Sequence, residues 1–256
     1  MTPTDTLYGS QWHFASLGTR GSELLIQRIW NEYDGTGIHV GVYDEGIQIS
    51  HPDLDNNYNS ALHVVIAGQT LSGVNTSGGY PHGTSVAGLI AAENNGSDSV
   101  GVAFGADVTG VNIFNPNSSI YINSANATVL NNFFNAVRQG TNFDVINNSW
   151  SSPPHYFADG NLNNPNSFAA RLVDAYSYIS ENGREGLGTV IVQSAGNDYT
   201  YSNGDGANAT RFTITVGALR ESGYMASYSN GGADLLVSAP GGDYADLGEP
   251  GIVTTD

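Results

Sequence analysis

The sequence contains no cysteine, so disulfide bonds and thiolate chemistry are excluded. It also lacks an apolar run long enough to cross a bilayer, and its first residues do not combine a basic region with an apolar stretch. We therefore expect no membrane span. We also expect the chain to begin at a mature domain, or to have lost a targeting segment.

Basic residues are scarce: 7 Lys and Arg stand against 24 Asp and Glu, which gives a formal net charge of −17. A nucleic-acid backbone would be repelled by this charge, so nucleic acid is not expected as a partner. Cationic peptides and metal ions are the natural complements of such a surface. A solvated acidic surface that keeps the protein soluble accounts for most of the acids.

With 256 residues and 39% hydrophobic residues, the chain can form one large domain around a sizeable core. Short apolar runs alternate with helical patterns, which predicts an α/β protein with a mostly parallel sheet in a single domain over residues 1–256. The predicted strands are Ile38–Tyr43, His63–Ala67, Val108–Phe114, Val145–Asn148, Thr189–Ser194, Phe212–Val216 and Leu235–Ala239. The predicted helices are Ser22–Tyr33, with Ser22 as N-cap, and Gly83–Ala92, Ser124–Arg138 and Ser167–Asn182, the last stopped by Asn182-Gly183.

Polar residues follow three of these strands, at the edge of a parallel sheet where ligands bind. They are Asp44, Ser149 and Asn197, while His82 opens a predicted helix. Each has an ordinary structural explanation when taken alone, as a turn, a cap or a helix start. An acid that orients a base, a base that moves protons and an amide that stabilises an oxyanion together indicate acyl transfer.

The residues around these positions resemble the motifs of the subtilase family of serine proteases. Val42–Ile47 with His51–Leu54 resembles the aspartate motif, His82–Gly88 the histidine motif and Gln193–Asn197 the oxyanion segment. The resemblance implies a subtilisin-like three-layer α/β fold with a mostly parallel central sheet of about seven strands. Further similarity to the kexin and furin branch lies in Gln11-Trp12-His13, Asn148-Ser149-Trp150, Gly186–Val190 and Ile252–Asp256.

This resemblance implies roles for particular residues. Asp44 would orient His82, the general base and then acid, and the side chain of Asn197 would stabilise the oxyanion, a contribution of roughly 3–4 kcal/mol in the transition state. Ser149, Trp150 and Ser151 would form an edge to which the substrate adds as a strand. A subtilisin-like endopeptidase acting on peptide or protein substrates is the function that follows.

The nucleophile of the family lies in a Gly-Thr-Ser segment shortly after the part matched by Ile252–Asp256. The only Gly-Thr-Ser in this sequence is Gly83-Thr84-Ser85, which belongs to the histidine motif. We therefore expect the catalytic serine on a C-terminal fragment that accompanies this chain, as in a nicked or divided enzyme. A truncated chain, or loss of the residues that follow Asp256, are the alternatives.

Two acids match the family's binding sites for basic side chains. Glu45 corresponds to the acid of the S2 subsite and Asp205 to the acid at the floor of S1, which implies cleavage after Lys or Arg. A solvated side chain and a turn residue are the alternative interpretations of these acids. The family's second S1 acid is replaced within Ser151–His155, and the carboxylates that hold a calcium ion beneath S1 are absent, which implies a looser preference.

A different calcium site is implied by the resemblance. Asp5, Asp53 and Asn95 match family ligands, with the backbone carbonyls of Ser97 and Ser99 close by. Hard oxygen donors of this kind suit a structural Ca²⁺ ion.

Two functions remain open on the sequence: a secreted or otherwise extracytoplasmic serine endopeptidase, and a catalytically inactive scaffold that keeps a peptide groove. Retention of Asp44, His82 and Asn197 together favours the enzyme. An unrelated acidic calcium-binding protein does not account for the set of motifs.

Overall fold

A computed structural model of the chain describes residues 1–14, 26–75, 81–151 and 164–255. Its centre is a sheet of six parallel strands in the order β4-β1-β5-β6-β7-β8. The strands are β1 (His39–Asp44), β4 (Asp107–Asn112), β5 (Val145–Asn148), β6 (Val190–Ser194), β7 (Thr213–Leu219) and β8 (Leu235–Pro240).

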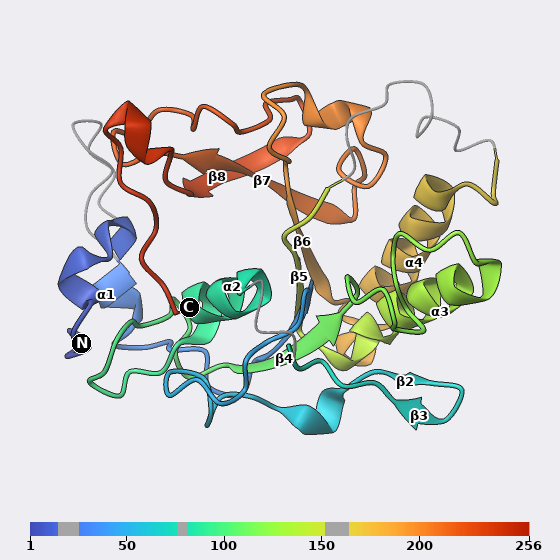
Figure 1. Cartoon of the computed structure of the whole chain (residues 1–256), viewed down its shortest axis with the longest axis horizontal. Helices are drawn as coiled ribbons and strands as arrows, with labels where there is room; N and C mark the ends of the chain where they lie inside the picture. Colours follow the sequence, from blue (N-terminus) through green and yellow to red (C-terminus); the bar gives the residue numbers. More distant parts are fainter. Residues whose placement is uncertain (15–25, 76–80, 152–163, 256) are drawn as a thin grey trace.

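Helices lie on both faces of this sheet, in three layers, with α2 (His82–Ala91) on one face and α3 (Ala127–Arg138) and α4 (Phe168–Asn182) on the other (Figure 1). The short helix α1 (Ile26–Ile29) packs with Phe14 and Val100 in a separate cluster. Short 3-10 helices connect the elements: η1 (Tyr8–Ser10), η2 (Trp12–Phe14), η4 (Ser60–Leu62), η5 (Gln139–Asn142), η6 (Arg184–Gly186), η7 (Ser202–Gly204) and η8 (Ala245–Leu247). The predicted α/β fold with a mostly parallel sheet is confirmed. Among the described residues, no helix has the length and apolar character needed to cross a membrane.

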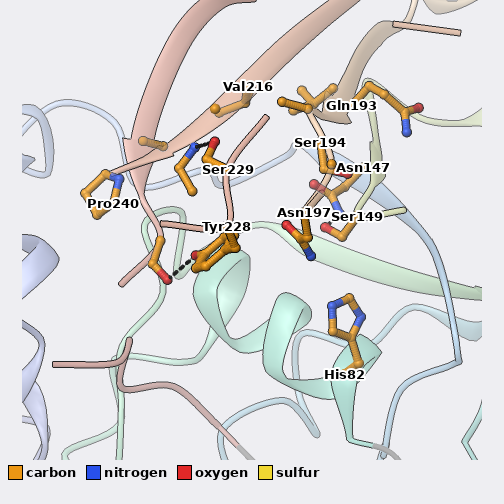
Figure 2. Close-up of a pocket in the computed structure, with 17 residues that line it drawn as sticks. His82, Asn147, Ser149, Gln193, Ser194, Asn197, Val216, Tyr228, Ser229 and Pro240 are labelled. Atoms are coloured by element: carbon orange, nitrogen blue, oxygen red, sulfur yellow. Dashed lines mark hydrogen bonds between the residues drawn. The ribbon is translucent and has the colours of Figure 1, made fainter. Parts of the chain in front are cut away.

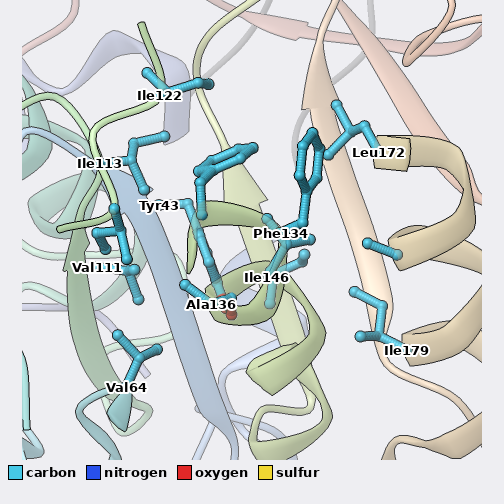
Figure 3. Close-up of a cluster of buried hydrophobic side chains, with 14 of the residues drawn as sticks. Tyr43, Val64, Val111, Ile113, Ile122, Phe134, Ala136, Ile146, Leu172 and Ile179 are labelled. Atoms are coloured by element: carbon cyan, nitrogen blue, oxygen red, sulfur yellow. The ribbon is translucent and has the colours of Figure 1, made fainter. Parts of the chain in front are cut away.

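Two hydrophobic clusters fill the space between the layers, because alternate residues of a strand face opposite sides of the sheet. Tyr43, Ile146 and Ile191 pack beneath α3 and α4, and Figure 3 shows Tyr43, Ile146, Phe134 and Leu172 in this larger cluster. Val42, one residue before Tyr43, faces the other side and packs against α2. Burial on both faces fixes the register of β1 between its two neighbours.

One predicted strand does not join the central sheet, so the sheet has six strands and not about seven. Of His63–Ala67, only β2 (Val65–Ile66) is a strand, and it pairs antiparallel with β3 (Gln69–Thr70). The chain reverses at Ala67 and Gly68, which both have positive φ, of 50° and 79°. Two such residues make the turn of a tight hairpin, which returns the chain on itself before it can reach the sheet.

The helices α2, α3 and α4 begin and end close to the predicted positions, whereas α1 is much shorter than predicted. In α3 the start moves to Ala127, because the side chain of Asn126 accepts a hydrogen bond from the Thr128 N–H at 2.8 Å and caps the helix there. In α4, Ser167 is the N-cap and Gly183 follows the last helical residue. The helix α1 ends at Ile29, earlier than predicted, in a turn closed by the Tyr33 N–H on the Ile29 carbonyl. The predicted Ser22 cap lies outside the described residues.

Candidate active site

The strand order of the central sheet reverses at β1. The next strand of the sheet in the chain, β4, lies on one side of β1, and the strand after that, β5, lies on the other side of β1. In open parallel sheets the carboxyl ends of strands at such a point diverge and leave room for a ligand. Asp44 is the last residue of β1, and Asn148 is the last residue of β5.

Asp44 and His82 form a hydrogen-bonded pair at this point. His82 Nδ1 lies 2.8 Å from Asp44 Oδ1 and 3.0 Å from Oδ2. The carboxylate is almost wholly buried, whereas the imidazole side chain is 54% exposed. Hydrogen bonding to Asp44 raises the pKa of His82 above its ordinary value, and desolvation of the ring opposes this rise. The arrangement leaves Nε2 to act on a substrate while Nδ1 is held by the acid.

The position of His82 is set by α2, of which it is the first residue. Ala87 and Ala91 on this helix are fully buried and pack in the same cluster as Val42 of β1. Small side chains allow the helix to approach the strand closely, so the first turn of α2 lies beside the end of β1. The packing of α2 against β1 therefore places the imidazole of His82 beside the carboxylate of Asp44.

Asn197 and Ser149 line the same cleft as His82 (Figure 2). The cleft has a volume of about 350 Å³ and extends to residues of β7, such as Val216, and to Pro240 at the end of β8. Asn197 follows β6 and is exposed to this cleft. The structure therefore brings together Asp44, His82 and Asn197, the three residues that the sequence singles out for acyl transfer.

The predicted substrate edge, Ser149 to Ser151, continues β5 beyond its end and is attached to β6. The Trp150 carbonyl accepts hydrogen bonds from the Gln193 side-chain amide and from Ser194 Oγ, the latter at 3.1 Å. Gln193 is fully buried, and its Oε1 accepts a hydrogen bond from the Tyr176 hydroxyl of α4 at 3.0 Å. Trp150 and Ser151 also line a second pocket of about 260 Å³ with Phe114, Ile122, Asn123 and Phe168.

The two predicted specificity acids lie in different surroundings. Desolvation and the neighbouring Asp44 raise the pKa of Glu45, and its Oε2 is buried without a hydrogen-bond partner among the described residues. Asp205 is buried in the turn after η7, where its carboxylate accepts the Ala207 N–H at 2.8 Å. In the same turn the Asn208 side-chain amide donates to the Ser194 and Ala195 carbonyls at the end of β6, and Asp205 is not among the residues that line the cleft.

The predicted calcium ligands gather around one loop. Asp5 Oδ1 accepts the N–H groups of Asn95 and Gly96 at 3.1 Å, and Asp53 Oδ2 accepts the N–H and the hydroxyl of Ser99 at 3.1 Å. The second oxygen of each carboxylate is buried without a hydrogen-bond partner in the described part of the chain. Buried carboxylate oxygens are costly unless paired, so this donor set fits a bound cation.

The remaining two residues of the predicted calcium site are at the same loop. Asn95 Oδ1 accepts the Ser97 N–H at 2.8 Å, and the Asn95 side-chain amide donates to the Pro52 carbonyl at 3.0 Å. Groups of three or more His, Cys, Asp or Glu that could hold a metal ion do not occur among the described residues.

Several serines lie near the cleft, and their hydroxyls are engaged elsewhere. Ser149 Oγ accepts from Asn147 Nδ2, Ser194 Oγ donates to Trp150, and Ser229 Oγ accepts the Ala218 N–H. None of the serines that the structure describes is hydrogen-bonded to the His82 ring, which has Asp44 as its partner. Ser85 is on α2, with its N–H bonded to the Pro81 carbonyl, and is not a residue of the cleft.

Two buried polar residues around the site were not singled out for a role from the sequence. Asn230 forms four hydrogen bonds to the segment that carries Asn197, and Gln193 supports the substrate edge. In the sequence, Asn230 stands before two glycines and has the pattern of an ordinary turn. Only spatial contact distinguishes it from other asparagines.

A parallel sheet with a carboxylate and imidazole pair at its carboxyl edge, and an amide in the same cleft, has the arrangement expected of a site for acyl transfer. Residues 35–255 match the family model described as "Subtilase family". The chain belongs to the subtilase family.

Individual relatives agree with this assignment. The chain is 29% identical to furin-like protease 2 of Drosophila melanogaster over 88% of this chain and 13% of that protein. It is 28% identical to human proprotein convertase subtilisin/kexin type 6 over 98% of this chain and 25% of that protein. The crystal structure of the Aeromonas sobria serine protease in complex with its chaperone superimposes with a TM-score of 0.77 at 25% identity, covering 99% of this chain and 45% of that one. The chain thus spans less than half the length of these relatives.

Proposed function

We propose that this chain forms the aspartate and histidine part of a serine endopeptidase that cleaves peptide bonds after basic residues. The observation that carries the proposal is the hydrogen bond between Asp44 and His82 Nδ1, with Asn197 in the same cleft. In this mechanism His82 takes the proton of an attacking serine and later gives it to the leaving amine, while Asp44 holds the tautomer and stabilises the imidazolium. The Asn197 amide donates to the developing oxyanion.

The nucleophile is proposed to come from a segment outside residues 1–256 that packs in the cleft. The open surface of β6 to β8 supports this proposal. Val192 and Val216 line the cleft, whereas Ile191, which alternates with Val192, faces the α3 and α4 side. Val237 of β8, which pairs with Val216, is 49% exposed. Parallel sheets are stable when apolar residues on both faces are covered, so a further helix over this region would complete the third layer.

Preference for basic residues before the cleaved bond is proposed from Glu45 and Asp205. Glu45 lies directly beside Asp44, and its partly buried carboxylate gains from a cationic partner. Asp205 is a buried acid in the turn that the Asn208 side-chain amide attaches to the Ser194 and Ala195 carbonyls at the end of β6. The substrate main chain is proposed to pair with Ser149, Trp150 and Ser151 as an added strand.

A structural Ca²⁺ ion is proposed between Asp5, Asp53 and the loop with Asn95, Ser97 and Ser99. The two unpartnered carboxylate oxygens support it. When bound, the ion would supply charge compensation that fixes this loop, with no part in the chemical steps. An extracytoplasmic location is proposed as well, since the Aeromonas sobria relative, 30% identical over 87% of this chain, is described as an extracellular serine protease.

The decisive experiment compares this chain alone with the same chain produced together with a C-terminal segment that carries the family's Gly-Thr-Ser motif. Both preparations are treated with a fluorophosphonate probe and with fluorogenic peptides that carry Arg, Lys, Ala or Glu at P1. Labelling and hydrolysis by the longer form alone, with Arg and Lys preferred, are the expected results. Peptide binding without labelling in either form would instead indicate an inactive peptide-binding scaffold. Equal cleavage after Arg and Ala would contradict the role of Asp205.

A further inference from the structure

The buried residue Asn230 is hydrogen-bonded to the backbone both before and after Asn197. Asn230 Oδ1 accepts the N–H of Asp198 at 2.9 Å and the N–H of Thr200 at 3.0 Å. Asn230 Nδ2 donates to the Ala195 carbonyl at 2.9 Å. The backbone N–H of Asn230 donates to the Gly196 carbonyl at 2.9 Å.

These contacts leave little freedom around Asn197. Asn230 is 1% exposed, and both lone pairs of its Oδ1 are used by the two N–H donors. Gly196 has a φ of 100°, and a Cβ there would lie 2.5 Å from Asn230 Nδ2 and 2.9 Å from Ser151 Oγ. The backbone beside Asn197 is therefore fixed in a conformation that needs glycine and is packed directly on Asn230.

Asn230 is itself anchored to the central sheet. The Ser229 hydroxyl accepts the Ala218 N–H of β7 at 2.9 Å and donates to the Asn230 carbonyl at 3.1 Å. A connection thus runs from β7 through Ser229 and Asn230 to the loop after β6. The loop takes its position from the rigid sheet, although the Asn197 side chain is exposed.

This rigidity matters because an oxyanion donor acts only at the correct distance. The amide must lie about 2.7–3.1 Å from the position that the oxyanion will occupy, and a preorganised donor has no reorganisation to undergo during the reaction. An exposed side chain on a loop achieves this only if its backbone is held. The four hydrogen bonds of Asn230 fall on residues 195, 196, 198 and 200, immediately before and after Asn197.

We infer that Asn230 is a positioning residue that holds the Asn197 amide at the oxyanion site. The inference rests on the proposed function, since it assigns a role within the same reaction. Asn230 itself touches no reacting atom. Its removal therefore weakens the contribution of Asn197 and leaves the binding of substrate largely unchanged.

The test is a double-mutant cycle in the catalytically competent protein, with kcat expressed per active site after titration with a fluorophosphonate. Asn197→Ala is expected to lower kcat about 10²–10³-fold. Asn230→Ala is expected to lower kcat about tenfold or more with KM changed less than threefold. In the Asn197→Ala background, Asn230→Ala should cost less than threefold in kcat, because there is no amide left to position. The exposed Asn203 provides the control, and Asn203→Ala should match the wild type.

A conservative variant covers the case in which Asn230→Ala does not fold. Asn230→Asp keeps the shape of the side chain and the two acceptor bonds to Asp198 and Thr200, but it places a carboxylate oxygen against the Ala195 carbonyl. Its loss of kcat should again fall below threefold in the Asn197→Ala background, with the melting temperatures measured in parallel.

The outcomes separate this inference from the proposed function. No labelling and no hydrolysis by the wild type would contradict the proposed function itself. An active wild type in which Asn230→Ala has normal kcat would overturn the positioning role. So would equal losses from Asn230→Ala with and without Asn197, since these indicate a purely structural effect. Non-additive losses in kcat with an unchanged KM would support it.

Discussion

Asp44 is buried at the end of β1, and the half-exposed imidazole of His82 lies against it with Nδ1 2.8 Å from its Oδ1. A buried acid paired with an accessible base leaves one ring nitrogen oriented and the other free for proton transfer. The two residues are 38 positions apart in the chain, and they meet because α2 crosses beside the carboxyl end of β1.

Replacing Asp44 by Asn should abolish most activity without loss of the fold. The side chain keeps its shape, but an amide that donates to Nδ1 favours the wrong imidazole tautomer, so kcat should fall roughly 10⁴-fold. Steady-state kinetics of the competent protein measure this, and Asp55→Asn, at an exposed site, is the control. A loss below tenfold would show that Asp44 does not orient the base.

The pH dependence of kcat/KM should follow the protonation of His82. Because Asp44 raises the pKa of His82 above 6.5, the neutral base forms at a higher pH than for an ordinary histidine. Activity should therefore be lost as the pH falls through this raised pKa, and Asp44→Asn should move the acidic limb to lower pH. The contribution of the Asp44–His82 pair to the stability of the fold depends on pH in the opposite direction to activity. This contribution is complete below pH 6.5 and is lost as the pH rises through the raised pKa of His82. An acidic limb that stays in place in Asp44→Asn would contradict this assignment.

Removal of calcium should lower the melting temperature. A ligand present at about 100 times its Kd contributes roughly 2.7 kcal/mol to the free energy of unfolding. Chelation with EGTA should remove this contribution in the wild type, whereas Asp53→Asn should be less stable and insensitive to EGTA. Asp55→Asn serves as the matched control. Melting curves that do not change with calcium would exclude the proposed site.

Glu45→Gln should reduce the preference for a basic residue at P2. The change removes the charge but keeps the size of the side chain, so kcat/KM for a P2 Lys peptide should fall about tenfold relative to P2 Ala, or about 1.4 kcal/mol. The exposed Glu32→Gln is the control. Competition between the two peptides measures the ratio directly, and an unchanged ratio would remove Glu45 from the S2 subsite.

Loss of the Gln193 side chain should weaken substrate binding more than catalysis. The amide holds the Trp150 carbonyl, and the Tyr176 hydroxyl orients the amide, so Gln193→Ala should raise KM several-fold. Tyr176→Phe should act in the same direction with a smaller effect. Burial raises the pKa of Tyr176 well above 10, so its hydroxyl remains a donor across the working pH range. Gln69→Ala, on the exposed hairpin, should leave KM unchanged.

The sequence by itself determined the α/β class, most of the strands and the residues of the acid and base pair. These features depend on local periodicity and on short motifs, and a motif such as His82–Gly88 can be recognised from the sequence alone. Strand β5 has the predicted bounds, Val145–Asn148, and lies in the middle of the sheet between β1 and β6.

Tertiary structure decided the remainder. The run His63–Ala67 is apolar enough for a central strand, yet the left-handed turn at Ala67 and Gly68 folds it into a separate hairpin. The roles of Asn230 and Gln193 depend on hydrogen bonds to residues distant in the sequence, which composition and spacing do not encode. A local pattern specifies which element a residue belongs to, whereas the packing of elements decides which polar groups meet.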